Sequence, residues 1–559
     1  MIRYYQKTFL SLFLLFIPVF TFGAYLFMNA VNVPYDDDEA LLYTINRAHH
    51  FPSDILRILL EQHNDHRIFF SRLASVTIDF LHGKMDFRIM ILCGFFNLIL
   101  LGHAFFLVFK SFTRNLLYFV PVFVLLFSPI VYATQLWSIT AFEQTLAIAF
   151  SLYSLYFLQP EKRKIWYYSI PLAIAATLSN LDGLGVIPIA LVWLITQKRK
   201  KESLLFGIFS IVYLFLFFVD FHFSASSRFP QFPQIIPILL KSFIAFSGSI
   251  VKVVSDSHVY VLSVILGGFM LLTYAVFVVM KFSKAAKWKN PDFSISFPEI
   301  CFLKLLACAF MIALGRAGHA TENMFADRFQ IYSAGIFITF YLLILSNLRN
   351  KQLSHLLFLI FFTSSLFLSM LSYVKYDGAV AFHNDELKAD AYNYRNHLLY
   401  IHQYCKEPDP KAEFYEHYTF PEYFNTELIS GWDKQMKSQK VLLPASFTSN
   451  ILNYSSEYEG SHYPVVNFEV TNLTALIPQK NVCLLLSQSN KIAKPFLIAI
   501  RPNNRRWFGE LLGRNTPSNS FIATFPSKIP DNLYDVALCW TINNVPKSVL
   551  IARNFKISE

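Results

Sequence analysis

The order of apolar and polar positions divides the chain into a membrane part and a polar C-terminal part. Apolar runs of about 20 residues, the length that crosses a bilayer, recur up to about residue 375. Two runs, 166–180 and 183–196, are shorter than a full crossing needs, so a tilted or partly sunken hairpin is expected there. Together the runs predict eleven spans, near residues 8–28, 89–109, 116–134, 141–158, 166–180, 183–196, 203–221, 259–280, 300–315, 329–346 and 354–374.

The composition supports this division and removes several classes of protein. Hydrophobic residues make up 54% of the chain and charged residues only 15%, whereas an ordinary soluble domain carries about 25% charged residues. These values exclude a soluble enzyme, a disordered tail protein and a disulfide-rich secreted module. The fold class expected is a polytopic α-helical membrane protein with an exoplasmic C-terminal α+β domain.

The net charge of +11 suggests a nucleic-acid partner until its distribution is considered. The basic residues cluster between alternate apolar runs, for example at 162–164 and 198–201. Such alternation places the clusters in the cytoplasm, and it predicts an inner N-terminus, an outer C-terminus and no nucleic-acid partner. We expect an integral protein of a bacterial inner membrane with its C-terminal domain in the periplasm.

Three domains follow from the change in pattern along the chain. Residues 1–375 form a transmembrane domain whose first outer loop, 29–88, holds two amphipathic helices on the membrane surface. Residues 376–439 form a helical exoplasmic connector. Residues 440–559 alternate short Val-, Ile- and Phe-rich runs with turn residues, which predicts a small antiparallel β-sandwich. Many carbohydrate-binding modules have this shape, although a fold does not fix a function.

The cysteines show no metal or redox spacing. Cys405, Cys483 and Cys539 are expected in the exoplasmic part. Cys483 and Cys539 both fall in predicted strands, and either a disulfide or two buried thiols fits that position.

The first outer loop begins with the acidic segment Tyr35-Asp36-Asp37-Asp38-Glu39. Adjacent carboxylates repel one another, so a cation, a basic partner or a helix N-terminus must offset the repulsion. One interpretation is that Asp36 to Asp38 cap a helix that begins near Glu39. The other is that these acids supply a general base or hold a divalent cation, with Asp36 and Asp38 as its ligands.

A second polar segment follows in the same loop: Glu61-Gln62-His63-Asn64-Asp65-His66-Arg67. In a helix, His63, His66 and Arg67 would share one face and form a cradle for a phosphate or a sugar hydroxyl. A zinc site would use a different His spacing, and a polar interfacial helix is the simpler alternative.

Charged residues elsewhere fall at the ends of spans. A late outer loop holds five of them: Arg316, His319, Glu322, Asp327 and Arg328. The two arginines suit phosphate binding, and anchoring of span ends is the alternative. Glu143 and Asp182 are expected near outer ends and Lys304 near a cytoplasmic end, while Arg228 lies in another outer loop.

Together these segments resemble the GT-C superfamily of membrane glycosyltransferases, especially its members related to protein mannosyltransferases and lipid A aminoarabinose transferases. The resemblance covers residues 1–375 and rests on an acidic segment after the first span and on the polar element at 63–67. Residues 179–185 resemble the Gly-containing turn of that family. Phe325-Ala326-Asp327-Arg328-Phe329 resembles a small-Ser-Arg-Tyr element, with Asp in place of Ser and Phe in place of Tyr.

The resemblance implies inverting transfer of a sugar from a polyprenyl-phosphate carrier to an exoplasmic glycan, lipid or protein acceptor. An acid of the first loop is then the base, and we expect Asp38 in that role, with Asp36, Asp37 and Glu39 as competitors. Residues for the substrate phosphate are expected at His63, Asn64, Asp65, His66, Arg67, Arg316 and Arg328. Further candidates for the site are Glu143, Asp182, Arg228, His319, Glu322 and Asp327.

Two other functions remain open from the sequence. A transporter or flippase for lipid-linked sugars would show central acids and matched halves, of which the sequence has few signs. A non-catalytic envelope protein would bind glycan through its β domain. The enzyme hypothesis predicts that Asp36–Glu39, His63–Arg67 and Arg316–Arg328 converge in one outer cavity.

Overall fold

The computed structural model describes residues 2–556 with internal gaps. The gaps are residue 114, 223–234, 288–294, 317–323, 404–412, 440–445, 457–460, 474–481, 490–493, 503–519, 527–528, 531 and 543–544. The chain forms two compact units. The first comprises Met1–Met28, Arg47–Ser75 and Met90–Tyr373, and the second comprises Asn29–Asn46, Val76–Ile89 and Val374–Glu559.

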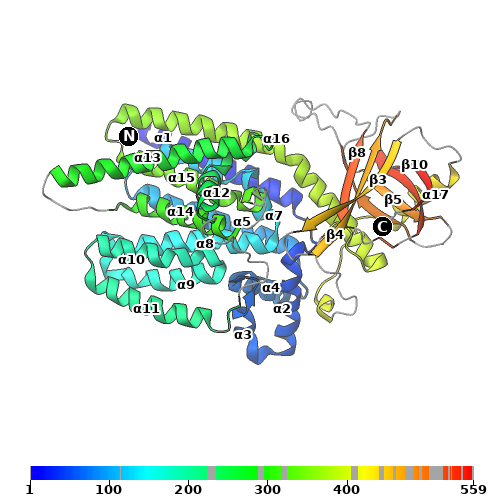
Figure 1. Ribbon diagram of the computed structural model, residues 1–559, viewed down its shortest axis with the longest axis horizontal. Coiled ribbons are helices and arrows are strands. Elements are labelled where there is room, and N and C mark those ends of the chain that lie inside the picture. Colours follow the sequence, from blue (N-terminus) through cyan, green and yellow to red (C-terminus); the bar gives the residue numbers. More distant parts are fainter. Residues whose placement is uncertain are drawn as a thin grey trace. The chain divides into compact units, whose positions relative to one another are not determined.

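Helices make up nearly all of the first unit (Figure 1). The helices that lie wholly or partly in it are α1 (Ile2–Asn29), α2 (Glu39–His50), α3 (Ile55–Leu60), α4 (Phe69–His82), α5 (Phe87–Lys110), α6 (Val120–Leu126), α7 (Tyr132–Leu136), α8 (Ser138–Phe157), α9 (Ser169–Ser179), α10 (Val186–Thr196), α11 (Lys200–Phe218), α12 (Ile235–Ser247), α13 (Val259–Lys287), α14 (Phe297–Arg316), α15 (Gln330–Asn347) and α16 (Lys351–His397). Helices α2 and α3 lie where the two amphipathic helices of the first loop are expected, and α4 follows them in the same loop. Their location on the membrane surface stays a prediction.

Among the described residues, seven helices are long and apolar enough to cross a membrane, and eight if one bent pair is counted as a span. The seven are α1, α5, α11, α13, α14, α15 and α16, and the bent pair joins Leu116–Leu126 to Pro129–Leu136 at 42°. A polytopic membrane protein is therefore confirmed, but a count of eleven spans is not supported. The runs expected at 141–158, 166–180 and 183–196 form helices that do not meet the same criteria of length and apolarity.

The helices α9 and α10 form a short hairpin rather than two complete spans. Each has 11 residues, about 16 Å of helix, where the apolar core of a bilayer is about 30 Å thick. The 3-10 turn η6 (Leu181–Gly185) joins them. At Gly183 a Cβ atom would lie 2.1 Å from the carbonyl oxygen of Ala176, so this turn requires glycine.

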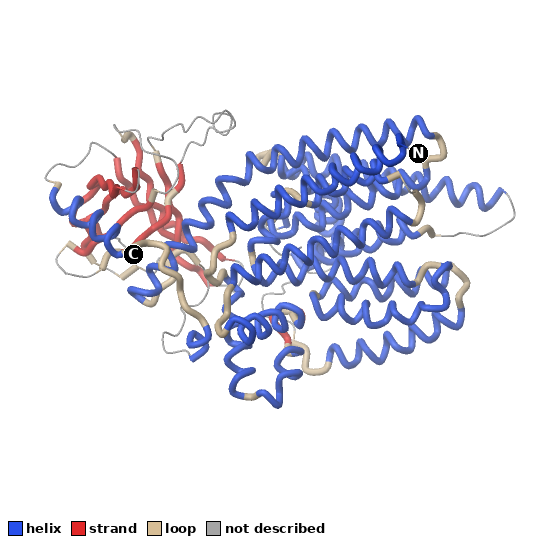
Figure 2. The backbone as a smooth tube through the Cα atoms, turned by 180° about the vertical axis from the view of Figure 1, so that it is seen from behind, coloured by secondary structure: helices blue, strands red, loops and turns tan. Residues whose placement is uncertain are grey.

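The second unit contains two antiparallel sheets, which Figure 2 shows in red. One sheet has the order β10-β9-β5-β6 and the other β3-β4-β8-β7. The strand bounds are β3 (Ser446–Ser456), β4 (Ser461–Thr471), β5 (Cys483–Gln488), β6 (Phe496–Ala499), β7 (Arg501–Pro502), β8 (Phe521–Pro526), β9 (Leu533–Ile542) and β10 (Val545–Lys556). The expected C-terminal sheet region is confirmed.

Alternation along the strands gives this domain two apolar layers. Alternate residues such as Phe468 of β4, Leu484 of β5 and Phe525 of β8 share one buried core, so the two sheets pack as a sandwich. The opposite face of β5 and β9 is covered by α16 and by α17 (Thr426–Ser438), whose Trp432 is buried there. Cys483 and Cys539 pair in register within this second layer, and both are free buried thiols.

Candidate functional site

Residues 62–67 form a β-hairpin, and the helix considered from the sequence is wrong. Strand β1 (Gln62–His63) pairs with β2 (His66–Arg67), and His63 lies opposite His66. The two-residue turn has Asn64 at φ 47°, a left-handed conformation that Asn tolerates and a helix excludes. The two imidazoles remain neighbours, with ring centroids 5.7 Å apart.

Two arginines fix the hairpin through backbone carbonyls. Arg72 of α4 donates to the carbonyls of Ile58 (3.2 Å) and Glu61, and burial lowers the pKa of Arg72 to about 10 despite the opposing charge of Glu61. Arg67 donates to the carbonyl of Phe217 at 2.9 Å, and its guanidinium lies 5.3 Å from the centroid of the Phe217 ring. The guanidinium of Arg67 therefore joins the hairpin to the end of α11.

The hairpin places an imidazole against a buried carboxylate. His66 Nε2 lies 3.2 Å from Glu143 Oε1. The Glu143 side chain is 8% exposed and the His66 side chain 20% exposed. A carboxylate that orients an imidazole is a common arrangement for proton transfer, because the carboxylate stabilises the protonated ring.

The guanidinium of Arg328 lies against the ring of Trp137, the residue just before α8, and α8 carries Glu143. The guanidinium of Arg328 lies 5.4 Å from the centroid of the Trp137 ring, and α8 begins at the next residue. The Thr134 hydroxyl donates to the carbonyl of Arg328 at 2.7 Å. Aromatic and backbone contacts thus hold a planar, permanently charged donor that suits bidentate phosphate binding.

The turn that carries Arg328 is fixed by an ion pair. In the 3-10 turn η9 (Asp327–Phe329), Asp327 Oδ1 lies 2.6 Å from Lys252 Nζ, and the Tyr132 hydroxyl donates to Asp327 Oδ2 at 2.9 Å. The guanidinium of Arg316, at the end of α14, lies 5.5 Å from the centroid of the Phe329 ring. The residues from Tyr132 to Glu143 therefore contact both the hairpin and the late loop within the first unit.

The acidic segment belongs to the second unit and forms a turn just before α2. Capping of α2 by these acids, and their use as a base or cation site, both stay predictions. Residues Asp36–Asp38 form a 3-10 turn, and α2 begins at Glu39 as expected. The Asp38 carboxylate, in a residue only 2% exposed, accepts the Tyr35 backbone N–H at 3.1 Å. The Asp36 backbone N–H donates to Gln403 at 3.0 Å. The predicted convergence of all three polar segments in one cavity stays a prediction.

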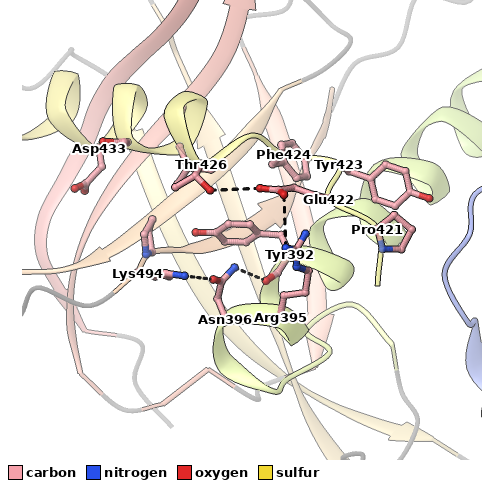
Figure 3. A pocket seen from close by; sticks show the side chains of 13 residues that line it. Tyr392, Arg395, Asn396, Pro421, Glu422, Tyr423, Phe424, Thr426, Asp433 and Lys494 are labelled. Atoms are coloured by element: carbon pink, nitrogen blue, oxygen red, sulfur yellow. Dashed lines mark hydrogen bonds and ion pairs between the residues drawn. The ribbon is translucent and has the colours of Figure 1, made fainter. Parts of the chain in front are cut away.

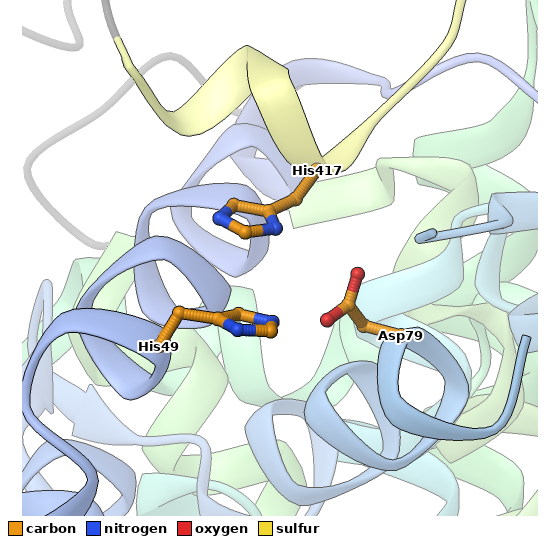
Figure 4. A group of neighbouring side chains, drawn as sticks. All are labelled: His49, Asp79 and His417. Atoms are coloured by element: carbon orange, nitrogen blue, oxygen red, sulfur yellow. The ribbon is translucent and has the colours of Figure 1, made fainter. Parts of the chain in front are cut away.

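Asp79 and His417 make a second acid–imidazole neighbourhood in the second unit. Figure 4 shows Asp79 on α4 and His417 at the end of the 3-10 helix η10 (Glu413–His417). The carboxylate oxygen and imidazole nitrogen that could serve as ligands lie within 4.8 Å of each other.

The first unit also holds a buried polar network. The Tyr332 hydroxyl donates to Asp182 Oδ1 at 3.0 Å, and the Cys308 thiol donates to Asp182 Oδ2 at 3.2 Å. Lys304 Nζ donates to the Asp182 carbonyl at 3.1 Å and lies 3.8 Å from Oδ2. Asp182 and Lys304 therefore lie at the same depth, and the expectation that they occupy opposite ends of spans is wrong. Because α9 is short, its turn reaches only the middle of α14.

Sequence reasoning did not single out several residues of these groups. Tyr132, Thr134, Cys308 and Tyr332 are residue types that occur throughout the membrane spans, and only their contacts distinguish them. Lys252 was detectable as one of the few cations outside the cytoplasmic clusters. Four residues singled out from the sequence lie outside the described residues: Arg228, His319, Glu322 and Cys405.

Comparison with known proteins gives one match. The model of the EpsG family matches residues 89–388, more than half of the chain. The chain belongs to the EpsG family. This family of membrane proteins is associated with glycosyltransferase-like or polymerase-like function. The comparison with curated proteins and the comparison with solved structures gave no match.

The family match divides the candidate residues. It includes Glu143, the Asp182 network, Arg316 and the turn that carries Asp327 and Arg328. The acidic segment and the hairpin precede its first residue. The region that the family model matches therefore contains the groups of the helix bundle.

Proposed function

We propose that this EpsG-family chain is an inverting membrane glycosyltransferase. It transfers a sugar from a polyprenyl-phosphate carrier to an exoplasmic glycan, lipid or protein acceptor, and it follows the GT-C pattern. The observation that carries the proposal is the stretch of residues 132–143, which contacts the imidazole of His66 at Glu143 and the guanidinium of Arg328 at Trp137. A proton acceptor and a phosphate ligand are the two groups that this reaction needs.

In this mechanism the His66–Glu143 pair takes the proton of the acceptor hydroxyl. The acceptor oxygen forms a bond to the anomeric carbon while the bond from that carbon to the carrier phosphate oxygen breaks. The electron pair of the broken bond stays on the phosphate, and the guanidinium of Arg328 balances the new charge. Transfer in one displacement inverts the anomeric configuration.

An alternative assignment places the base in the acidic segment. Asp38, or its neighbours Asp36, Asp37 and Glu39, would then take the proton, with a divalent cation held by Asp36 and Asp38. The assignments are separable because the amide oxygen of Asn can still accept the Tyr35 backbone N–H. Asp38→Asn therefore removes the charge and keeps this hydrogen bond.

The test measures turnover of a polyprenyl-phosphate-linked sugar by the full chain in proteoliposomes. The proposal expects Glu143→Gln and His66→Ala to lower kcat by at least a hundredfold, a loss typical of a missing general base. Asp36→Asn, Asp37→Asn and Asp38→Asn should each stay within a few-fold of wild type, as should Glu161→Gln at an exposed site. Loss of turnover only in Asp38→Asn, or on removal of divalent cations with EDTA, would move the base to the acidic segment.

Transport of a lipid-linked sugar is the second candidate function. The Asp182–Lys304 pair favours it, since paired charges and broken helices inside the bundle are features of transporters. A transporter would move the labelled lipid across the proteoliposome membrane and leave its sugar attached. A transferase separates the sugar from the lipid.

A further inference from the structure

A pocket of about 340 Å³ lies on the second unit, and none of the candidate site residues described above lines it. Its walls come from the end of α16, the first turns of α17, the segment 421–424 and the residues just before β6. Its volume is near the lower end of the range of about 300–1,000 Å³ that ligand pockets span. The pocket is therefore large enough for one or two sugar rings.

Aromatic and polar groups alternate around this pocket. Figure 3 shows the Tyr392 ring between the Glu422–Thr426 pair and the Lys494–Asn396 pair. The rings of Tyr392 and Phe424 lie edge to face, with centroids 6.3 Å apart. An aromatic face beside planar polar side chains suits a sugar ring, which offers C–H groups on its faces and hydroxyl groups at its edge.

The polar groups are ordered by contacts with one another. Lys494 Nζ donates to Asn396 Oδ1 at 2.7 Å, and Asn396 Nδ2 donates to the Tyr392 carbonyl at 2.8 Å. The Thr426 hydroxyl donates to Glu422 Oε1 at 3.3 Å, and Arg395 Nη2 lies 3.6 Å from Glu422 Oε2. These contacts orient donors and acceptors before a ligand arrives, which reduces the entropic cost of binding.

Two features indicate hydrogen bonding to a neutral ligand. The charged groups that line the pocket, Arg395, Lys494, Glu422 and Asp433, balance to zero, so the pocket offers no net attraction to a phosphate or a carboxylate. Asp433 Oδ1 is buried and has no hydrogen-bond partner among the described residues, although Oδ2 accepts from Lys437 at 2.7 Å. A sugar hydroxyl would satisfy this acceptor once the Asp433 side chain turned its buried Oδ1 toward the pocket.

A second pocket of about 300 Å³ shares Tyr423 and Phe424 with the first. Trp432 and Leu428 also line it, so it adds an apolar surface next to the polar one. A ligand that contacted both pockets would have to be longer than one ring. An oligosaccharide therefore fits this arrangement better than a single sugar does.

We propose that the pocket lined by Tyr392, Asn396, Glu422 and Lys494 binds a neutral oligosaccharide. Binding at this site needs no sugar transfer, so the proposal stands independently of the proposed catalytic function. A membrane protein of a glycosyl-handling family would use such a site to retain the glycan that it extends or recognises.

The test is calorimetric titration of the full chain in lipid nanodiscs. The probes are cellotetraose, maltotetraose, mannotetraose and chitotetraose, with trigalacturonic acid and tetra-alanine as an anionic and a peptide comparison. The proposal expects at least one neutral tetrasaccharide to bind, and more tightly than its monosaccharide. Lys494→Met and Tyr392→Ala should each weaken that binding at least tenfold, and Glu422→Gln should weaken it several-fold.

Matched variants separate the pocket from general effects of charge and fold. Lys547→Met removes an exposed lysine of β10, and Glu427→Gln removes an exposed acid of α17, and neither residue lines the pocket. Both should bind the tetrasaccharide as wild type does. The proposal is overturned if no neutral tetrasaccharide binds, if the pocket variants bind as tightly as the controls, or if only trigalacturonic acid or tetra-alanine binds.

Discussion

The Asp182–Lys304 pair is expected to stabilise the helix bundle only while both partners are present. Lys304 is fully buried on α14, and Asp182 is 5% exposed at the tip of the α9–α10 hairpin. Asp182→Asn leaves an ammonium group in the bundle without a charged partner among the groups that contact it, and Lys304→Met leaves a carboxylate in the same position. We therefore expect both single variants to be less stable than wild type.

The free energy of unfolding lost in each single variant follows from two independent scales. Breaking a buried ion pair by removing one partner costs about 3–5 kcal/mol, and a lone charge at the centre of a membrane helix costs about 2.5–3.5 kcal/mol. A loss of about 3 kcal/mol corresponds to a drop of only about 3 °C in the unfolding midpoint, because the unfolding entropy of a chain of 559 residues is large, about 1.2 kcal/mol/K. The Tyr332 hydroxyl keeps an acceptor in the Asp182→Asn variant, because the new amide side chain retains one oxygen.

The double variant decides whether the two residues act as a pair. Asp182→Asn with Lys304→Met removes both charges, and its midpoint should lie closer to wild type than that of either single variant. The assay heats the detergent-solubilised chain to a series of temperatures. Size-exclusion chromatography then measures how much folded protein remains after each step. Lys388→Met serves as the control, because its ion pair with Asp385 is 4.0 Å long and partly exposed. A double variant that loses as much as the two single variants combined would refute the reasoning.

Three further predictions concern the turns and the arginine of the candidate site. Gly183→Ala should lower the unfolding midpoint in the same thermal assay, because the new Cβ would meet the Ala176 carbonyl at 2.1 Å. The control Gly315→Ala should leave the midpoint unchanged or raise it, because a Cβ there has no neighbour within 4 Å. Asn64→Gly should keep glycosyl transfer, and Asn64→Val should reduce it. The reason is that the left-handed φ of 47° costs a β-branched residue about 1–2 kcal/mol. Equal turnover of the two variants would show that the turn of the β1–β2 hairpin does not matter. Arg328→Lys should retain part of the turnover that Arg328→Gln loses, because a lysine keeps the charge without the planar donor pair; a steady-state assay in which Arg328→Gln matches wild type would contradict the phosphate role.

Much of the fold follows from the sequence because burial in a membrane leaves a strong pattern. Apolar runs such as 203–221 and 259–280 correspond to α11 and α13, and strand alternation at 464–470 and 536–542 corresponds to β4 and β9. Hydropathy alone did not distinguish a complete span from a short helix. The hairpin of α9 and α10 is set by the close approach of Gly183 to Ala176, a contact within the turn that the glycine marks and hydropathy does not record.

The candidate site was less predictable because its residues meet through contacts between distant parts of the chain, and their intervals along the sequence do not show these contacts. His63 and His66 are neighbours in either a helix or a hairpin, so their spacing did not separate the two structures. Asp182 and Lys304 are 122 positions apart, and only the depth of the turn brings them together. The contact between His66 and Glu143 joins residues 77 positions apart in the same way.

The most direct test of the account is the mass of the lipid and glycan products formed by the purified full chain. Proteoliposomes are supplied with a polyprenyl-phosphate-linked sugar and an acceptor glycan, and the products are separated and weighed by mass spectrometry. The wild-type chain should give free polyprenyl phosphate and an acceptor heavier by one sugar, and Glu143→Gln should give neither product above background. Recovery of the intact lipid-linked sugar from the wild-type reaction, or normal products from Glu143→Gln, would contradict the account.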